Sequence, residues 1–234
     1  MKDIHQGKYP GNCPGKDAAR HFVYQLLAKS HDSGKFQKYF HIHIMSYEGG
    51  DHKYLNKFKV KQLTCDQDEE ARRLARKRRV RMAPEPICQS IVATVEWALK
   101  KKLPIYTINV DFCNTLANFE KQQDIQTILN LVDLNEVWVF LTFKRGREPG
   151  WSIKDRWEKL GIQRGDYKIY PANIFEYQNG PGSPMGVAIW GPASIGYERD
   201  YNSKTWHTSR MSYDEQLSIK PGPYNKKGKT EYEQ

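Results

Sequence analysis

The sequence predicts an α/β protein with a mostly parallel central sheet, helices on both faces and a C-terminal antiparallel hairpin. Segments with strand character alternate with segments of helical periodicity from Lys16 to Trp157, which is the pattern of a parallel sheet. The run 136–143 is apolar without interruption, which indicates a strand buried on both faces near the middle of that sheet. Two last strand-like segments are joined by the Gly- and Pro-rich stretch 178–184, which predicts a hairpin at one edge.

Each element is predicted from its own pattern of residues. Apolar residues at helical spacing indicate helices, and β-branched and aromatic runs indicate strands. The expected helices cover 16–29, 52–58, a segment opening at Asp68, 87–102, 118–132 and 152–160. The expected strands cover 38–47, a segment ending at Cys65, 103–110, 136–143, 167–177 and 185–190, with a short extended piece over 80–86.

The chain divides into three parts by composition. Residues 1–15 are rich in Gly, Pro, Lys and His and predict an irregular N-terminal arm. Residues 16–195 hold the alternating helices and strands and are expected to form one Rossmann-like domain. Residues 196–234 are polar, and we expect this C-terminal tail to be partly disordered.

The composition is that of a protein in aqueous surroundings, with 27% charged residues and a mean hydropathy of -0.79. No apolar run approaches the roughly 18 residues of a membrane span, and the N-terminus lacks the apolar core of a signal peptide. We therefore expect a cytoplasmic protein with no membrane partner. The four cysteines, Cys13, Cys65, Cys88 and Cys113, lie far apart, so the sequence predicts reduced thiols and no metal site. It does not indicate the oligomeric state.

The chain is strongly basic, with a net charge of +10 and a pI near 9.3, which favours a polyanionic partner such as nucleic acid. Cations crowd the helix that opens at Asp68, in the residues Arg72, Arg73, Arg76, Lys77 and Arg79. At helical spacing Arg72, Arg76 and Arg79 share one face. Two interpretations stay open, namely binding of nucleic-acid phosphates and a solvated charged face.

Asp66 lies where a short strand ends and the Arg-rich helix is about to begin. In an open parallel sheet the ligand crevice lies at the carboxyl ends of the strands, and a carboxylate there can accept hydrogen bonds from both hydroxyls of a ribose. The alternative is that Asp66 is simply the N-cap of the helix.

A second turn of the same kind follows the strand predicted over 38–47, where Glu48 precedes Gly49 and Gly50. Glycines at the end of a strand let the backbone approach a ligand closely, and the free N–H groups of a following helix can face that ligand. An ordinary tight turn is the alternative.

Taken together, these positions resemble the class I S-adenosylmethionine-dependent methyltransferases. Glu48, Gly49 and Gly50 fall where that family has its glycine-rich loop, and Asp66 falls where it has the acidic residue that holds the cofactor ribose. By the same resemblance Met82 and Ala83 flank the adenine. The segment Asp111, Phe112, Cys113 and Asn114 lies at the fourth-strand tip, where the methyl donor meets the substrate.

The resemblance implies S-adenosylmethionine as cofactor and methyl transfer to nucleic acid, with a base as the favoured acceptor. The aromatic and acidic strand tip suits a base flipped out of its stack, and small divergent members of phage type share this architecture. Cys113 could add covalently to a pyrimidine, or it could be a small core residue. Because the two glycines are adjacent, a binding protein that kept the fold and lost the chemistry is the alternative.

His41 and His43 raise a different hypothesis, because two alternate histidines on one strand are typical of HUH endonucleases. In those metal-dependent nickases the histidines bind a metal that polarises the scissile phosphate while a tyrosine attacks. Tyr54 and Lys57 supply a Tyr-x-x-Lys motif. Such an enzyme requires a mainly antiparallel sheet, so the orientation of the histidine strand distinguishes the two hypotheses.

Overall fold

The structure is a computed structural model, in which a six-stranded sheet forms the centre of the chain. It describes residues 20, 23–24, 27, 33–45, 50–115, 123–144, 158–171, 173–178 and 184–191. The predicted arm over 1–15 and the predicted tail over 196–234 lie outside these residues. No helix in the described part of the chain is long and apolar enough to cross a membrane.

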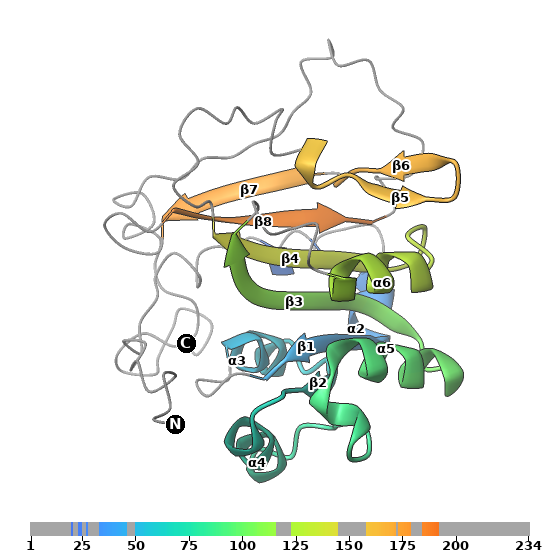
Figure 1. Ribbon diagram of the computed structural model, residues 1–234. Helices are drawn as coiled ribbons and strands as arrows, with labels where there is room; N and C mark the ends of the chain where they lie inside the picture. Colours follow the sequence, from blue (N-terminus) through green and yellow to red (C-terminus); the bar gives the residue numbers. More distant parts are fainter. Residues whose placement is uncertain are drawn as a thin grey trace, which may run out of the picture.

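The central sheet has the strand order β2-β1-β3-β4-β8-β7 (Figure 1). Its strands are β1 (Phe40–Ile44), β2 (Lys61–Cys65), β3 (Ile105–Thr115), β4 (Trp138–Lys144), β7 (Asn173–Gln178) and β8 (Pro184–Trp190). The pairs β1 with β2, β1 with β3 and β3 with β4 are parallel. β8 pairs antiparallel with both β4 and β7. The predicted parallel sheet with a C-terminal hairpin at one edge is therefore confirmed, with β4 near its middle.

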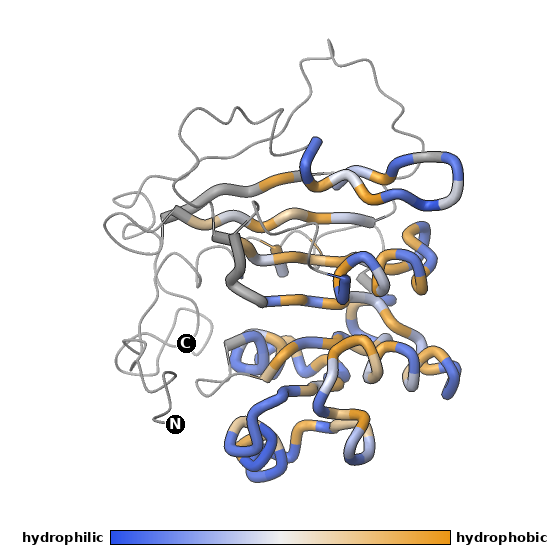
Figure 2. Tube along the Cα trace, viewed as in Figure 1, coloured by the Kyte–Doolittle hydropathy of each residue, from blue (hydrophilic) through white to orange (hydrophobic). Residues whose placement is uncertain are grey.

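Helices cover both faces of this sheet. They are α2 (Ser33–Lys38), α3 (Gly50–Lys57), α4 (Glu69–Lys77), the 3-10 turn η1 (Ile87–Gln89), α5 (Ile91–Lys100) and α6 (Gln123–Leu131). Figure 1 shows α5 and α6 together in front of the strands, while α4 lies beyond the β2 edge. In Figure 2 the tube of α4 is largely hydrophilic, in keeping with its charged residues.

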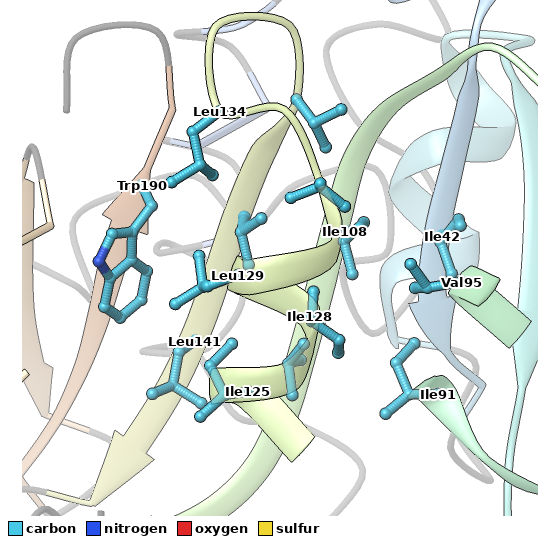
Figure 3. Packing of buried hydrophobic residues seen from close by; sticks show 14 of the residues in the cluster. Ile42, Ile91, Val95, Ile108, Ile125, Ile128, Leu129, Leu134, Leu141 and Trp190 are labelled. Atoms are coloured by element: carbon cyan, nitrogen blue, oxygen red, sulfur yellow. The ribbon is translucent and has the colours of Figure 1, made fainter. Parts of the chain in front are cut away.

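The larger core lies between the sheet and the layer of α5 and α6 (Figure 3). Ile91 and Val95 from α5 and Ile125 and Ile128 from α6 are buried there against alternate strand residues such as Ile108. A strand that contributes every second residue to one face leaves the others for the opposite face. Both faces of β4 are covered by helices, which explains why its sequence is apolar at successive positions.

The opposite face carries a second core, formed by α2, α3 and the helical residues 20, 23–24 and 27. Tyr24, Phe36 and Leu55 pack there against strand residues such as Tyr106 and Phe140. Phe140 is of the other parity of β4, whereas Tyr106 lies at the register shift where β3 pairs with the start of β1. This layer is rich in aromatic rings, and it covers the face that also carries the histidines of β1.

Two element predictions differ from the structure. The strand expected over 167–177 is two strands, because Pro171 interrupts it and β6 (Tyr167–Ile169) pairs instead with β5 (Ile162–Arg164) in a separate small sheet. Proline lacks the N–H that a ladder needs, so a break at this residue has a simple cause. The strand expected over 103–110 is longer and runs to Thr115 as β3.

Candidate functional site at the carboxyl edge of the sheet

The order of the strands reverses between β1 and β3. From β1 the chain first adds β2 on one side and then crosses over to add β3 on the other side. In open α/β sheets the ligand crevice lies at the carboxyl ends of the strands at such a switch point. A ligand site is therefore expected among the segments that follow β1, β2 and β3.

Asp66 follows β2 at this edge and is partly buried. Its Oδ1 accepts a hydrogen bond of 2.9 Å from the backbone N–H of Asp68, and its own N–H donates to the carbonyl of Cys88 at 3.0 Å. The N-cap of α4 is Asp68, whose Oδ1 accepts from the N–H of Ala71 at 3.0 Å. The alternative that Asp66 is the helix cap is therefore wrong, and a carboxylate held by a tight turn stands at the end of the strand.

Met82 and Ala83 lie beside the same strand end. Met82 forms an isolated parallel bridge with Thr64, whose N–H donates to the carbonyl of Arg81 at 2.9 Å. The side chain of Met82 is partly buried against Met45 and the first turns of α4, and Ala83 is buried. The backbone thus adds one more parallel pairing on the outer side of β2, at Thr64, two residues before Asp66.

The structure describes some of the other predicted site residues and not the rest. Gly50 is the first residue of α3, while Glu48 and Gly49 lie outside the described residues. Asp111 is partly buried on β3, opposite Thr142 of β4. The backbone of Phe112, Cys113 and Asn114 continues β3, and their side chains lie outside the described part of the chain. The structure therefore brings Gly50, Asp66, Met82, Ala83 and Asp111 to one edge of the sheet; their roles remain predictions.

A row of polar residues leads along β3 to this edge. Thr107, Asn109 and Asp111 alternate along the strand and so share one face. In the parallel register His41 lies beside Thr107, and His43 lies beside Asn109. Polar side chains thus run through the middle of the sheet on the face covered by α2 and α3.

This row ends in a buried charged cluster. Asp51, in the first turn of α3, is only 3% exposed and accepts a hydrogen bond of 3.1 Å from the phenol of Tyr24. Arg20 Nε lies 3.5 Å from Oδ1 of the same Asp51, and Arg20 Nη2 lies 3.8 Å from Oδ2 of Asp111. One guanidinium therefore joins the residues that follow β1 to the end of β3, across the switch point.

Burial, reinforced by the negative charge of Asp51, raises the pKa of Tyr24 well above its ordinary value, so the phenol stays a donor. The side chain of Asn109 also hydrogen-bonds Tyr24, which opposes that rise in pKa. The Oδ1 atom of Asn109 is buried and has no hydrogen-bond partner within the described residues. An acceptor left unpaired in a protein interior is costly, so it marks a place where a ligand donor would fit.

The histidine pair does not form a metal site. His41 Nε2 lies 2.8 Å from the carbonyl of Phe36, and Nδ1 lies 2.8 Å from the hydroxyl of Thr107, so both ring nitrogens are engaged. Burial lowers the pKa of His41 to about 4, and burial also lowers that of His43. Because β1 is parallel to both neighbours, the nickase hypothesis for His41 and His43 is wrong. The described residues contain no group of three or more acidic, His or Cys residues that could hold a metal.

The arginines of α4 have unequal surroundings. Arg72 is buried, pairs with Glu85 at 3.0 Å and donates to the carbonyls of Asp66 and Gln67 at 2.9 and 2.7 Å. Arg76 also contacts Glu85, and Arg73 pairs with Glu70 on the same helix. Lys77 and Arg79 are exposed. Arg72 therefore has a structural role, because its hydrogen bonds hold the turn that carries Asp66.

Some solved structures are similar to this chain at low sequence identity. No protein-family model and no curated protein matches the chain. An rRNA methylase from Streptococcus thermophilus is similar in structure, with 13% identity, a TM-score of 0.41 and coverage of 73% of this chain and 94% of that one. A TehB-like SAM-dependent methyltransferase from Corynebacterium glutamicum has 16% identity, a TM-score of 0.35 and coverage of 75% and 96%.

The bifunctional kinase-methyltransferase WbdD has 11% identity and a TM-score of 0.43, over 73% of this chain and 39% of its own. Because these identities and TM-scores are low, the fold is defined by the order and direction of the strands in this chain and not by the similarity to other structures. The parallel strands, the switch point and the terminal hairpin define a Rossmann-like α/β domain.

Arg20, Tyr24, Asp51 and Asn109 were not among the residues predicted for the site. Asn109 had a signal in the sequence, because polar residues at every second position of an otherwise apolar strand mark one face. Asp51 also had a signal, because it directly follows the two glycines of the predicted loop. Arg20 and Tyr24 had no such signal, because only the packing of the N-terminal helical residues on the sheet brings them to this edge.

Proposed function

We propose that the protein is an S-adenosylmethionine-dependent methyltransferase that acts on nucleic acid, with a base as the favoured acceptor. The observation that carries the proposal is the arrangement at the switch point. Asp66 follows β2, and Asp111 lies in the second half of β3. The buried Oδ1 of Asn109, two residues before Asp111 on the same strand, has no partner within the described residues.

These residues fit the cofactor by their chemistry. S-adenosylmethionine carries ribose hydroxyls and an amino group as donors, and it supplies an activated methyl group. Asp66 would accept from the ribose hydroxyls, and Met82 and Ala83 would flank the adenine. Asn109 Oδ1 offers an acceptor for a donor of the same ligand. Gly50, with Glu48 and Gly49 before it, would let the backbone come close.

The chain's own residues would prepare the acceptor. The carboxylate of Asp111 would accept a hydrogen bond from an exocyclic amine and take up the proton that this amine loses. Arg20, 3.8 Å away, would keep Asp111 ionised by its positive charge. Phe112 would stack on the base, Asn114 would help to orient it, and Cys113 would serve only in the alternative attack on a pyrimidine carbon.

The net charge of +10 supports nucleic acid as the substrate, because a basic protein is attracted to phosphates. One observation favours the second candidate, a nucleic-acid-binding protein without catalysis. Arg20 contacts Asp51 and Asp111 together and so lies across the switch point, where a cofactor would have to bind.

Transfer of tritium from labelled S-adenosylmethionine to mixed DNA and RNA tests the proposal. We expect incorporation by the parent and a loss of at least about a hundredfold in Asp111→Asn, the lower range for a lost acid–base group. Asp166→Asn, at an exposed turn between β5 and β6, is the matched control and should keep full activity. Incorporation that is equal in Asp111→Asn and in the control would contradict the role of Asp111. No incorporation by the parent would contradict the proposed function.

A further inference from the structure

Three helices of this protein end in the same unusual way. After α3, α4 and α5 the chain turns through a residue with positive φ, namely Lys59 (φ 53), Arg79 (φ 57) and Lys102 (φ 52). Each of the three turns then enters the segment that leads to the next parallel pairing: β2, the Met82 bridge and β3.

The hydrogen bonds identify each turn as a Schellman motif. The N–H of the left-handed residue donates to the carbonyl three residues earlier, and the next N–H donates to the carbonyl five residues earlier. The pairs are Lys59 to Asn56 and Val60 to Leu55, Arg79 to Arg76 and Val80 to Ala75, and Lys102 to Leu99 and Leu103 to Ala98. All of them lie between 2.9 and 3.5 Å.

Glycine is the residue that this position favours, because a Cβ is strained at positive φ, and Asn is the usual second choice. Here all three positions carry a long cationic side chain. Attraction to the negative end of the helix dipole does not explain the choice, since Lys57, Lys77 and Lys100 already place cations in the last helical turns. Each of the three helices thus carries a cation at a position where the backbone favours glycine. We take this to indicate that the charge contributes to function.

The three turns lie along one edge of the sheet, the amino edge, opposite the crevice. Cations precede or open four neighbouring parallel segments on this side: Arg79 and Arg81 before the Met82 bridge, Lys59 and Lys61 at β2, Lys38 at β1 and Lys102 at β3. All six are exposed. The sign of the charge changes at β4, which is preceded by the exposed Asp133 and Glu136. The basic character is thus confined to one stretch of the edge.

Two of these cations contact the same aromatic ring. Lys61 Nζ lies 5.8 Å from the ring centre of Phe40, and the guanidinium carbon of Arg81 lies 5.0 Å from the same centre. Arg81 is also 6.0 Å from the ring of Trp97. Cation–π contacts fix where these charges stand, and two like charges beside one ring repel each other unless an anion lies nearby.

We propose that these six residues, the amino-edge basic surface, bind the phosphate backbone of nucleic acid. With strands roughly 4.8 Å apart, the three intervals from the Met82 bridge to β3 span about 14 Å, over which duplex DNA presents about eight phosphates. The contacts are to phosphates, so binding at this surface is independent of base sequence.

The surface is separate from the crevice. The five residues of β1 separate the two edges by roughly 17 Å, which equals about five base-pair steps. Nucleic acid held here would therefore be a different stretch from the one whose base enters the crevice. This inference rests on the nucleic-acid part of the proposed function and not on methyl transfer.

The test uses the full chain with Lys59→Gly, Arg79→Gly and Lys102→Gly combined. Glycine relieves the strain at each turn while it removes the charge, so the melting temperature should equal or exceed that of the parent. Fluorescence anisotropy with a labelled duplex should show at least about tenfold weaker binding at 100 mM salt. The log–log salt slope should become shallower by about 2–3 units, since each phosphate contact contributes about 0.9.

Lys159→Gln with Lys168→Gln is the control, because it removes charge outside the central sheet, before β5 and on β6, and should leave the salt slope unchanged. Equal salt slopes for the parent and the glycine variant would overturn the amino-edge surface and leave the proposed function intact. A parent that binds neither duplex nor single strands would overturn both. Binding to phosphatidylserine vesicles without binding to nucleic acid would assign the surface to membranes and also overturn the inference.

Discussion

The phenol of Tyr24 donates a hydrogen bond of 3.1 Å to Oδ1 of Asp51, although 27 residues separate them. Tyr24 belongs to the N-terminal helical residues and Asp51 to the first turn of α3, and both are buried beside the switch point. The bond therefore fastens the layer above the sheet to the start of the helix that follows β1. A site at this edge depends on this hydrogen bond, because the bond holds the carboxylate of Asp51 in position.

Tyr24→Phe tests this connection. The variant removes only the hydroxyl, so the buried carboxylate of Asp51 loses a donor and Asn109 loses a partner. Hydrogen bonds to charged groups contribute about 1.5–3 kcal/mol, and we expect the free energy of unfolding in urea to fall by that amount. Tyr39→Phe, at a partly exposed position, is the control. Equal unfolding midpoints for the two variants would show that the hydrogen bond does not contribute to stability.

Arg72 and Arg73 are neighbours in sequence with different surroundings. Arg72→Gln leaves the carbonyls of Asp66 and Gln67 without their charged donor, so we expect a loss of about 1.5–3 kcal/mol in the free energy of unfolding. Arg73→Gln removes an exposed pair within one helix and should leave the melting temperature unchanged. Both variants lose one charge. If Arg73→Gln were the more damaging, the assignment of Arg72 to the Asp66 turn would fail.

Asp68 caps α4, and Asp66 does not. Asp68→Ala should therefore cost about 1 kcal/mol of stability, the usual loss for an N-cap side chain. Circular dichroism during urea unfolding measures this loss. A stability equal to that of the parent would contradict the cap.

The buried histidines make stability depend on pH. The pKa of His41 is lowered from 6.5 to about 4, chiefly by burial, and burial also lowers the pKa of His43 and of His52. Between these pH values the unfolded chain binds protons that the folded chain does not. The free energy of unfolding should therefore fall as the pH drops below about 6.5, and for His41 by up to about 1.4 kcal/mol per pH unit down to about pH 4.

NMR titration of the imidazole resonances gives the direct check. His41 should remain neutral down to about pH 5, and His41→Gln should flatten the dependence of stability on pH between 6.5 and 4. A midpoint for His41 near 6.5 would show that the ring is more solvated than its contacts with Phe36 and Thr107 indicate.

Local patterns predicted the fold because they are strong in this chain. The apolar run of β4 placed that strand in the middle of the sheet, and the Gly- and Pro-rich joint before β8 predicted the hairpin. The separate β5–β6 sheet was missed, since three-residue strands carry almost no periodicity. The 3-10 turn η1 was likewise absorbed into the predicted helix over 87–102.

The site was predictable only where it follows strand ends. The position of Asp66 and Asp111 at one edge could be predicted because a parallel sheet brings the carboxyl ends of its strands together, although β3 runs on past Asp111 to Thr115. Their roles stay predictions. Arg72 was assigned to the charged face by helical spacing, and its burial against Glu85 could not be foreseen, because Glu85 comes from a segment outside the helix. Arg20 and Tyr24 depend in the same way on long-range packing.

Titration calorimetry with S-adenosylmethionine tests the central claim most directly, and Asp66→Ala and Asp68→Ala form a matched pair for it. The parent should bind. Asp66→Ala should weaken binding by at least about tenfold, since a carboxylate that accepts from ribose hydroxyls contributes about 1.5–3 kcal/mol. Asp68→Ala should lose stability and keep its affinity, because it caps α4 and does not contact the cofactor. No heat of binding by the parent at millimolar cofactor would contradict the account and leave a nucleic-acid-binding protein without catalysis.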